Sequence, residues 1–385
     1  MKQRSWSRPF LSIILLTLAL LACTFSVDVL PTSTPVRPTL TAEAPTFTAV
    51  PTETFIPPSA TPTLIAIRPG MTSMLENFAT FQGGEVPRVV AFSPDGTFVA
   101  EAGGNTEDFA IRIWNVATER PVGILGGHSG FIEGLAFSPD GKYLVSASDD
   151  ATALVWDWVN GDRLKELEFP GGVYSVSFSP DGQTLAIGGV DEMENQIRNA
   201  AVWTFAVGSW EPGLKFREYW NVTSMAYSPN GEVLVGGGTS RNVQVWRTND
   251  GTSRYTLNHA HQVSDIAISP DGSTVATATC ITVVNSDCTE GGIWLWDLPT
   301  GTLLMQLSGF PYIVESVEFT ADGSMLIAAS RFGMVRFYST ADYKPVFDTT
   351  PPDGNGVLTL SRDSGLLATS SSNGEVRLWK VVYRP

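Results

Sequence analysis

One stretch of the sequence carries the residue types of a serine hydrolase. These residues are His128, Ser146, Ser148, Asp150 and, slightly further along the chain, Trp156. If a fold brought them into contact, a histidine oriented by a carboxylate could activate a serine hydroxyl as a nucleophile. A second interpretation is a buried polar network that stabilises a fold without doing chemistry. The spacing by itself is compatible with both.

Metal and cofactor chemistry has little support in the sequence. The chain has 3 histidines, and His259 and His261 would lie on one side of an extended strand. No third His or Cys nearby completes a metal site. The acidic stretch 191–195 lacks the spaced carboxylates of a calcium loop. The chain also has no GxSxG, P-loop, GxGxxG or HExxH motif. We therefore expect neither a metal ion nor a cofactor.

The charge balance limits the possible partners. The chain has 24 Lys and Arg against 39 Asp and Glu, which gives a formal net charge of −15. Sequence-independent binding to nucleic acid or to anionic lipid requires clustered cations, so we expect no nucleic-acid partner. Hydrophobic residues make up 43% of the chain, which is enough for a large core.

The first 22 residues have the layout of a secretory signal. Lys2, Arg4 and Arg8 precede an uncharged, mostly apolar run over residues 9–22 that is too short to cross a bilayer. The run ends in Leu-Leu-Ala-Cys23, which resembles the lipobox of bacterial lipoproteins. The resemblance implies cleavage before Cys23, acylation of its sulfur, and export to the bacterial cell envelope, with the lipid as the chain's one membrane contact. The alternatives are an ordinary signal peptide with an incidental cysteine and an uncleaved anchor.

Residues 23–67 have the composition of a linker. Between Thr24 and Ile67, Pro, Thr and Ser supply 22 of 44 residues, and neither a strand nor a helix period is present. Such a segment prefers an extended polyproline II conformation and cannot bury a core. We expect a disordered stalk between the leader (1–22) and a folded domain (68–385).

The remainder of the chain repeats one unit seven times. Each unit contains a Ser-Pro-Asp-Gly turn or a variant of it, beginning at Ser93, Ser138, Ser179, Ser228, Ser269, Thr320 and Ser361. Pro presets the first central position of the turn, and Gly accepts the left-handed conformation that closes it. An alternating strand precedes each turn and a second strand follows it. A third strand then ends in an aromatic residue: Trp114, Trp156, Trp203, Trp246, Trp296, Tyr338 or Trp379.

This pattern resembles the WD-repeat family over all residues from Gly70 onward. The resemblance implies an all-β, seven-bladed β-propeller of four-stranded antiparallel blades. Few residues follow Trp379, so the seventh blade lacks its outer strand. The family's shared blade implies that a strand within residues 74–81 supplies it and closes the ring.

The same resemblance assigns the serine, histidine and aspartate a structural role. His128, Ser146 or Ser148, Asp150 and Trp156 occupy the positions of the family's hydrogen-bonded tetrad. A partial version follows in the fifth repeat, with His259, Thr277 or Thr279, Glu290 and Trp296.

Two cysteines are expected to form a disulfide. If lipid occupies Cys23, Cys280 and Cys288 remain to pair in an oxidising, exported setting. They flank a polar loop of seven residues, Ile-Thr-Val-Val-Asn-Ser-Asp.

A partner site is expected on one face of the ring, the top face, where the innermost strands begin. The loop segments 190–199 and 280–292 are long and would form its walls. The predicted rim mixes aromatic and charged residues, as binding surfaces do, and consists of Arg88, Phe131, Glu133, Tyr174, Trp220, Tyr312 and Glu315. The alternative is that these aromatics only join neighbouring blades.

The function expected from these features is a non-catalytic, monomeric platform for a protein or peptide. The second possibility is a propeller that binds polysaccharide or a small ligand through the rim aromatics. The third is a propeller hydrolase or lyase, for which the sequence places only Glu133 and Glu315 in the channel.

Overall fold

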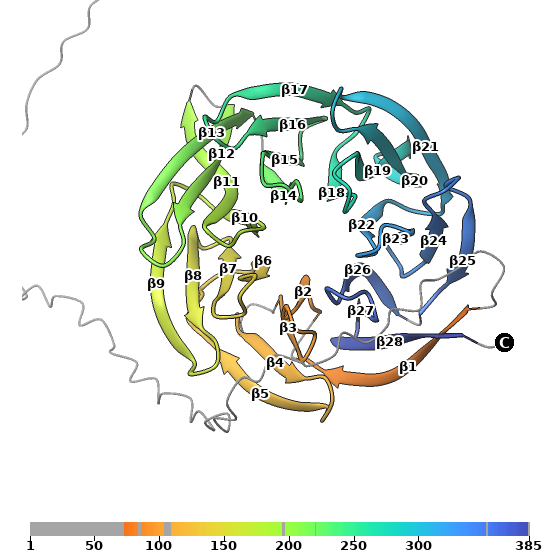
Figure 1. Cartoon of the computed structure of the whole chain (residues 1–385), viewed down its shortest axis with the longest axis horizontal. Helices are drawn as coiled ribbons and strands as arrows, with labels where there is room; N and C mark the ends of the chain where they lie inside the picture. The colour runs from red at the N-terminus through yellow and green to blue at the C-terminus, as the bar shows by residue number, and fades with distance from the viewer. Residues whose placement is uncertain are drawn as a thin grey trace, which may run out of the picture. The chain divides into compact units, whose positions relative to one another are not determined.

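A computed structural model describes residues 73–83, 86–103, 109–194, 197–219, 221–351 and 353–383. These residues form 28 strands in seven four-stranded antiparallel sheets, arranged as the blades of a propeller around a central channel (Figure 1). The all-β, seven-bladed fold expected from the repeats is confirmed. None of the described residues forms a helix of the length and hydrophobicity needed to cross a bilayer.

The strands of each blade run from the channel outward. Blade 1 contains β2 (Val89–Phe92), β3 (Phe98–Ala102), β4 (Ile111–Asn115) and β5 (Arg120–Leu125). Blade 2 contains β6 (Ile132–Phe137), β7 (Leu144–Ser148), β8 (Thr152–Asp157) and β9 (Asp162–Glu168). Blade 3 contains β10 (Val173–Phe178), β11 (Thr184–Glu194), β12 (Ile197–Ala206) and β13 (Pro212–Tyr219). Blade 4 contains β14 (Val222–Tyr227), β15 (Val233–Gly238), β16 (Asn242–Arg247) and β17 (Ser253–Asn258).

The last three blades follow the same order. Blade 5 contains β18 (Val263–Ile268), β19 (Thr274–Val284), β20 (Asp287–Asp297) and β21 (Thr302–Phe310). Blade 6 contains β22 (Val314–Phe319), β23 (Met325–Ser330), β24 (Val335–Ser339) and β25 (Pro345–Thr349). Blade 7 contains β26 (Gly354–Leu360), β27 (Leu366–Ser371), β28 (Glu375–Tyr383) and, on its outside, β1 (Ser73–Gln82).

The turns between the first and second strands join the blades on one face. In blade 2 the Ser138 hydroxyl donates to Asp140 at 2.6 Å and accepts from the Tyr143 N–H at 2.8 Å. Gly141 closes this turn with a left-handed φ of 73°. Pro139 of the same turn lies over Gly182 of the next blade, where an added Cβ would come within 3.7 Å of the proline ring. The prolines of the first five turns each pack against the glycine of the following turn in this way, which connects blades 1 to 6 on this face.

Hydrophobic layers fill the space between neighbouring blades. Between blades 2 and 3, Val145 and Val155 pack with Leu185 and Ile187, and all four are fully buried. Such layers form because alternate residues of each strand point to opposite faces of its sheet, and both faces are covered by a neighbouring blade. No single blade could bury its apolar faces alone.

The two ends of the described chain lie in one blade. β1 pairs antiparallel with β28, with Ser73 opposite Tyr383 and Gln82 opposite Glu375. The pairing places a strand from the N-terminal side at the outer edge of blade 7 (Figure 1).

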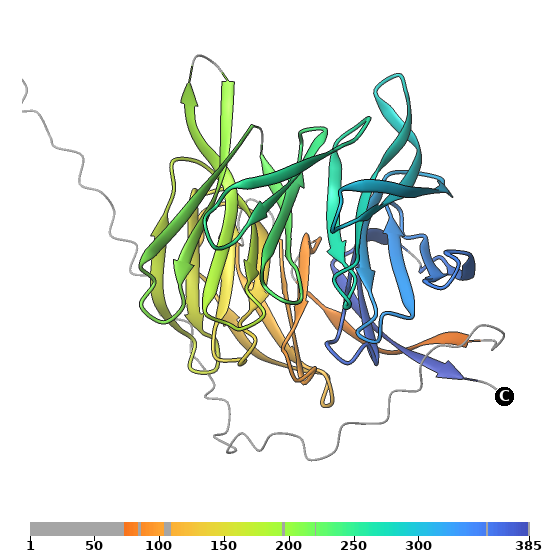
Figure 2. The ribbon, with the colours of Figure 1, turned by 45° about the horizontal axis from the view of Figure 1, so that its top comes forward.

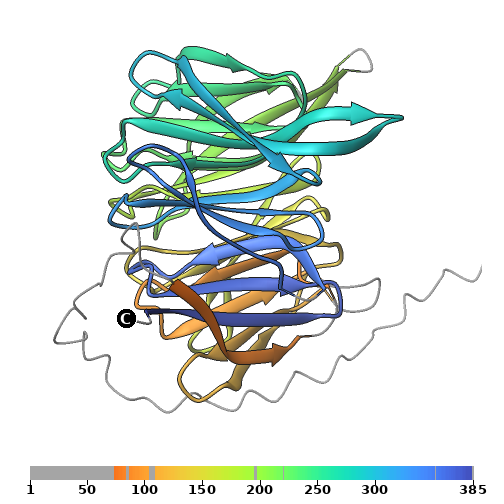
Figure 3. The same ribbon diagram turned by 90° about the vertical axis from the view of Figure 1, so that its right-hand side faces the viewer.

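Two hairpins extend beyond the blades to which they belong. β11 and β12 form the hairpin of blade 3, and β19 and β20 form that of blade 5. Both project from the face opposite the turn ring, as Figures 2 and 3 show from two directions. This face is the top face, and we refer to residues 280–291 at the end of the β19–β20 hairpin as the arm.

Candidate functional site

The channel opens on the top face into a cavity of about 990 Å³. All seven blades contribute to its wall. Six of the residues that lie five positions before the repeated turns line it: Arg88, Glu133, Tyr174, Thr223, Ser264 and Glu315. Their convergence follows from the repeat, because equivalent positions of the innermost strands point to the same end of the channel.

On one side of the mouth, an arginine lies between a carboxylate and an aromatic ring. The Arg88 guanidinium donates to Glu133 at 2.6 Å and lies over the Phe131 ring at 4.2 Å from its centroid. Phe131 in turn packs edge-on against Phe109 of blade 1 at 5.5 Å. Burial raises the pKa of Glu133 although Arg88 opposes it. Phe131 therefore joins blades 1 and 2, as the alternative interpretation of the rim aromatics expected.

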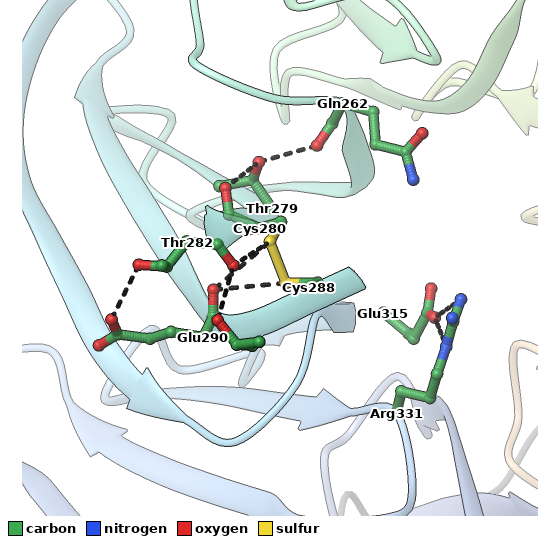
Figure 4. The surroundings of a disulfide bond; sticks show 9 residues. Gln262, Thr279, Cys280, Thr282, Cys288, Glu290, Glu315 and Arg331 are labelled. Atoms are coloured by element: carbon green, nitrogen blue, oxygen red, sulfur yellow. Dashed lines mark hydrogen bonds and ion pairs between the residues drawn. A yellow bond between two sulfur atoms is a disulfide. The ribbon is translucent and has the colours of Figure 1, made fainter. Parts of the chain in front are cut away.

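A second ion pair lies across the mouth in blade 6. Arg331 approaches Glu315 at 2.7 Å (Figure 4). Beside it, Tyr312 packs edge-on against Phe332 with ring centroids 4.7 Å apart. Tyr312 is 42% exposed and Phe332 63% exposed, so this aromatic pair faces solvent.

The predicted rim is thus divided between two locations. Arg88, Phe131, Glu133, Tyr174 and Glu315 line the cavity, whereas Tyr312 lies outside its lining. Trp220 lies outside the described residues, and its place in the rim stays a prediction. Sequence reasoning missed Arg331 and Phe332, which belong to the short loop between β23 and β24. A loop of this kind gives no periodic pattern, and Phe332 has a positive φ of 67° that its residue type does not announce.

Two further carboxylates occupy the innermost strands. Asp265 accepts hydrogen bonds from Ser224 at 2.8 Å and from the Val317 N–H at 2.9 Å. Glu318 accepts one from the Leu360 N–H at 2.8 Å. Burial raises the pKa of Asp265 to about 6 and that of Glu318 to about 8. Both acids were missed from the sequence, and each connects its own blade to a neighbour.

The serine, histidine and aspartate of blade 2 form a network rather than an open site. His128 Nδ1 lies 2.9 Å from Asp150, and its Nε2 lies 2.7 Å from the Ser146 hydroxyl. The Trp156 indole N–H donates to the same hydroxyl at 3.0 Å. Because the Asp150 carboxylate only accepts, Nδ1 carries the proton of this contact, and Nε2 of the neutral imidazole accepts from the Ser146 hydroxyl. Among the described residues, Ser148 accepts a hydrogen bond from the Asp150 N–H at 3.2 Å and forms none with His128.

The electrostatics of this network fit a structural role. Burial acts to raise the pKa of Asp150, but hydrogen bonds from His128, from Thr152 and from a backbone N–H outweigh it and lower the pKa. The Ser146 side chain is fully buried, so its hydroxyl is not accessible to a substrate. The arrangement holds strands β7 and β8 to the segment before β6.

Blade 5 has a reduced version of the network. His259 Nε2 lies 2.8 Å from the Thr277 hydroxyl, and Trp296 donates to that hydroxyl at 3.2 Å. Burial lowers the pKa of His259 to about 4. Glu290, expected in the acidic position, instead accepts a hydrogen bond from Thr282 in the arm.

The arm carries a disulfide. Cys280 of β19 and Cys288 of β20 are bonded to each other, with their Cα atoms 5.9 Å apart (Figure 4). Near its base, the Thr279 hydroxyl donates to the Gln262 carbonyl at 2.8 Å. Figure 4 shows the Glu315–Arg331 pair in the surroundings of the disulfide, so the arm lies beside the channel mouth.

The predictions for the N-terminal segments concern residues that the structure does not describe. The leader, Cys23 and the segment 23–67 lie outside the described residues, so the acylation of Cys23 stays a prediction. Within the described ranges, no group of three or more His, Cys, Asp or Glu side chains is placed to hold a metal ion.

The family model described as "WD domain, G-beta repeat" matches more than half of the chain. The matched residues are 76–115, 119–157, 161–193, 210–247, 251–297 and 346–380. Most of blade 6, including Tyr338 and the turn that begins at Thr320, falls between the last two matches. Propellers of this family are non-enzymatic scaffolds, which places the chain outside the enzymes.

Three proteins with similar sequences come from a fungus and two plants. A periodic tryptophan protein 2 homolog from Neurospora crassa is 31% identical over 190 residues, which are 43% of this chain and 20% of the relative. Periodic tryptophan protein 2 of Arabidopsis thaliana is 25% identical over 277 residues, 66% of this chain and 29% of the relative. Small ribosomal subunit protein RACK1y of Oryza sativa is 27% identical over 164 residues, 41% of this chain and 46% of the relative. The chain spans between a fifth and a half of the length of these curated relatives.

These relatives overturn the expected location. The lipobox resemblance implied export to a bacterial cell envelope, whereas the relatives are eukaryotic proteins, one of them a ribosomal protein by name. The prediction of a lipid-anchored location at the bacterial envelope is therefore wrong.

Proposed function

Because this chain belongs to the WD domain, G-beta repeat family, we propose that it is a non-catalytic platform that binds a protein or peptide at the top-face mouth of its channel. The exposed pair Tyr312 and Phe332 beside the cavity is the observation that carries this proposal. Large aromatics that face solvent in the unbound protein bury much area when a partner covers them.

The charged residues of the mouth suit a polypeptide partner. Arg88 and Arg331 each pair with a carboxylate and retain donors of the guanidinium fork for a backbone carbonyl. Glu133 and Glu315 offer acceptors to N–H groups. A cavity of about 990 Å³ lined from seven blades has room for several side chains.

The relatives support a role in assembly. One is named as a protein of the small ribosomal subunit, a particle of many components. Similarity to a protein of a multi-component particle supports a platform role for this chain. Such a role requires no catalytic group.

The proposal is tested by separating binding from folding. Partners captured by the wild-type chain are identified, and the affinity of the most enriched one is measured by calorimetry. Tyr312→Ala and Phe332→Ala should each weaken binding about tenfold while the melting temperature stays nearly unchanged. Leu164→Ala is the control, because Leu164 is also exposed but lies on outer strand β9.

Two outcomes contradict the proposal. Unchanged affinity in both aromatic variants would move the partner site away from the top face. A loss of affinity that follows an equal loss of melting temperature would mean that the aromatic pair only stabilises blade 6.

A further inference from the structure

The arm has a backbone edge with no partner strand in the described part of the chain. β18 pairs with β19 only as far as Val263 opposite Thr279, while β19 and β20 continue together to Val284 opposite Asp287. Because β18 is the innermost strand of its blade, this free edge of β19 faces the channel side. Within residues 281–284, the backbone groups that point away from β20, those of Val283 above all, therefore have no strand partner beside the cavity among the described residues.

The tip of the arm is closed by a tight turn, and a disulfide links its two strands. Asn285 and Ser286 have φ values of 51° and 73°, as a two-residue hairpin turn requires. The disulfide between Cys280 and Cys288 links its two strands. At the base, Gly291 lies so close to the next blade that an added Cβ would be 2.0 Å from the Tyr312 carbonyl oxygen. A strand that binds here would meet a pre-formed edge, which lowers the entropy cost of binding.

The free edge is irregular, with register shifts between Cys280 and Thr282 and between Thr282 and Val283, but it lacks the charges and prolines that protect other sheet edges. Its sequence is Ile281-Thr-Val-Val284, all β-branched, with no charge and no proline. Val283 and Val284 are 41% and 50% exposed. The hairpin of blade 3 differs, because its corresponding edge carries Asp191, which forms an ion pair with Lys215 at 2.8 Å. An inward charge of that kind prevents strand pairing.

The charges of the arm itself favour a basic occupant, and the nearby Arg331 is paired with Glu315. Residues 280–292 contain Asp287 and Glu290 but no Lys or Arg. Strands are about 4.8 Å apart, so an added strand would lie about 10 Å from β20, which is about one Debye length at 0.1 M salt, and the attraction is strongest at low ionic strength. A second copy of this chain would carry a formal net charge of −15 and be repelled.

We propose that an extended, basic peptide segment of a partner protein pairs as a β-strand with the free edge of β19 and continues into the mouth of the channel. The inference rests on the proposed function and specifies its partner: backbone pairing supplies the affinity, and cationic side chains supply the selectivity.

The geometry of the hairpin shows which backbone N–H a proline substitution should remove to test strand pairing. The two-residue turn closes on Val284 and Asp287, so the N–H and C=O of Val284 face β20. The next residue, Val283, must then direct its N–H to the free edge. Val283→Pro deletes that donor and leaves the hairpin's own ladder intact, because proline is tolerated where the N–H faces outward. Val283→Thr is the matched control, since it keeps the N–H and the β-branched shape.

The test uses the full chain and two labelled peptides, acetyl-(Thr-Lys)5-amide and acetyl-(Thr-Glu)5-amide, with binding followed by fluorescence anisotropy. The Lys peptide should bind at least about tenfold more tightly than the Glu peptide. Val283→Pro should lower the affinity for the Lys peptide about tenfold, whereas Val283→Thr should lower it by less than about twofold. Thermal melting and thiol titration check that each variant is folded and keeps its disulfide.

The outcomes separate this inference from the proposed function. Equal binding of the Lys peptide to wild type and Val283→Pro overturns strand addition, as does the absence of any binding to wild type. If Val283→Pro leaves peptide binding unchanged while Tyr312→Ala lowers the affinity for the captured partner, the platform function is supported and strand addition is contradicted. A dimer of the wild-type chain that Val283→Pro dissociates, seen by light scattering, would make the occupant a second copy and also overturn the proposal.

Discussion

Phe81 of β1 stacks on Trp114 of β4, with ring centroids 5.2 Å apart and planes inclined by only 10°. Phe81 belongs to the outer strand of blade 7, and Trp114 ends the third strand of blade 1. Their contact therefore crosses from the last blade of the chain to the first. Both are buried together with Val99, Val376 and other apolar residues of the two blades.

The first prediction concerns this contact. Phe81→Ala should lower the free energy of unfolding by about 3 kcal/mol or more, because it leaves a cavity against the Trp114 ring. Thr80→Ala, at an exposed position on the same strand, should change it by less than about 0.5 kcal/mol. Urea unfolding followed by tryptophan fluorescence measures both. Equal effects of the two variants would mean that β1 contributes little to holding the ring closed.

The second prediction distinguishes the two serines of β7. Ser146→Ala leaves His128 Nε2 and the Trp156 N–H without their partner inside the protein. It should therefore cost about 1–3 kcal/mol of stability. Ser148→Ala removes one longer hydrogen bond from an equally buried position and should cost less. Thermal unfolding of both variants checks the order, and the opposite order would contradict the assignment of Ser146 to the network.

The third prediction concerns pH. The folded-state pKa of Glu318 is raised from 4.5 to about 8, so between these values the folded protein keeps a proton that the unfolded chain releases. Stability contributed by this proton is present below pH 4.5 and is lost as the pH rises toward 8. Asp265, whose pKa is raised from 3.8 to about 6, acts in the same direction.

Glu318→Gln should therefore flatten the decline of melting temperature between pH 5 and pH 8. The difference from wild type at pH 8 should be on the order of a few kcal/mol. Melting curves recorded at several pH values provide the measurement. Parallel curves for wild type and variant would show that Glu318 does not titrate in this range.

The fourth prediction concerns the arm. Thiol titration of the denatured, unreduced chain should count two fewer thiols than titration after reduction, because Cys280 and Cys288 are bonded. Replacing both by serine should cost at most about 2–3 kcal/mol, the value expected for closing a loop of this length. Equal thiol counts before and after reduction would rule out the bond in solution.

The repeat predicted the fold because each blade obeys the same local rules. In blade 2, for example, the turn that begins at Ser138 predicts the strands on either side of it, and Trp156 marks the third strand. Neither prediction needs information from the rest of the chain. Side-chain partners were harder to predict. Ser146 and Ser148 have the same parity on one strand, so their pattern could not show which one meets His128. Asp265 was missed because a charged residue at an alternating strand position is normally interpreted as exposed to solvent. On an innermost strand, the same alternation places it at the channel.

The pairing of Ser73 with Tyr383 also bears on the order in which the molecule folds. Every other strand pair joins neighbours along the sequence, whereas this one joins residues at opposite ends of the described chain. Made from an unfolded chain, such a contact would cost about 5 kcal/mol of loop-closure entropy. Local hairpins carry no such penalty and form quickly. We therefore expect the blades to stack outward from early hairpins, with β1 joining last and leaving first when the protein unfolds.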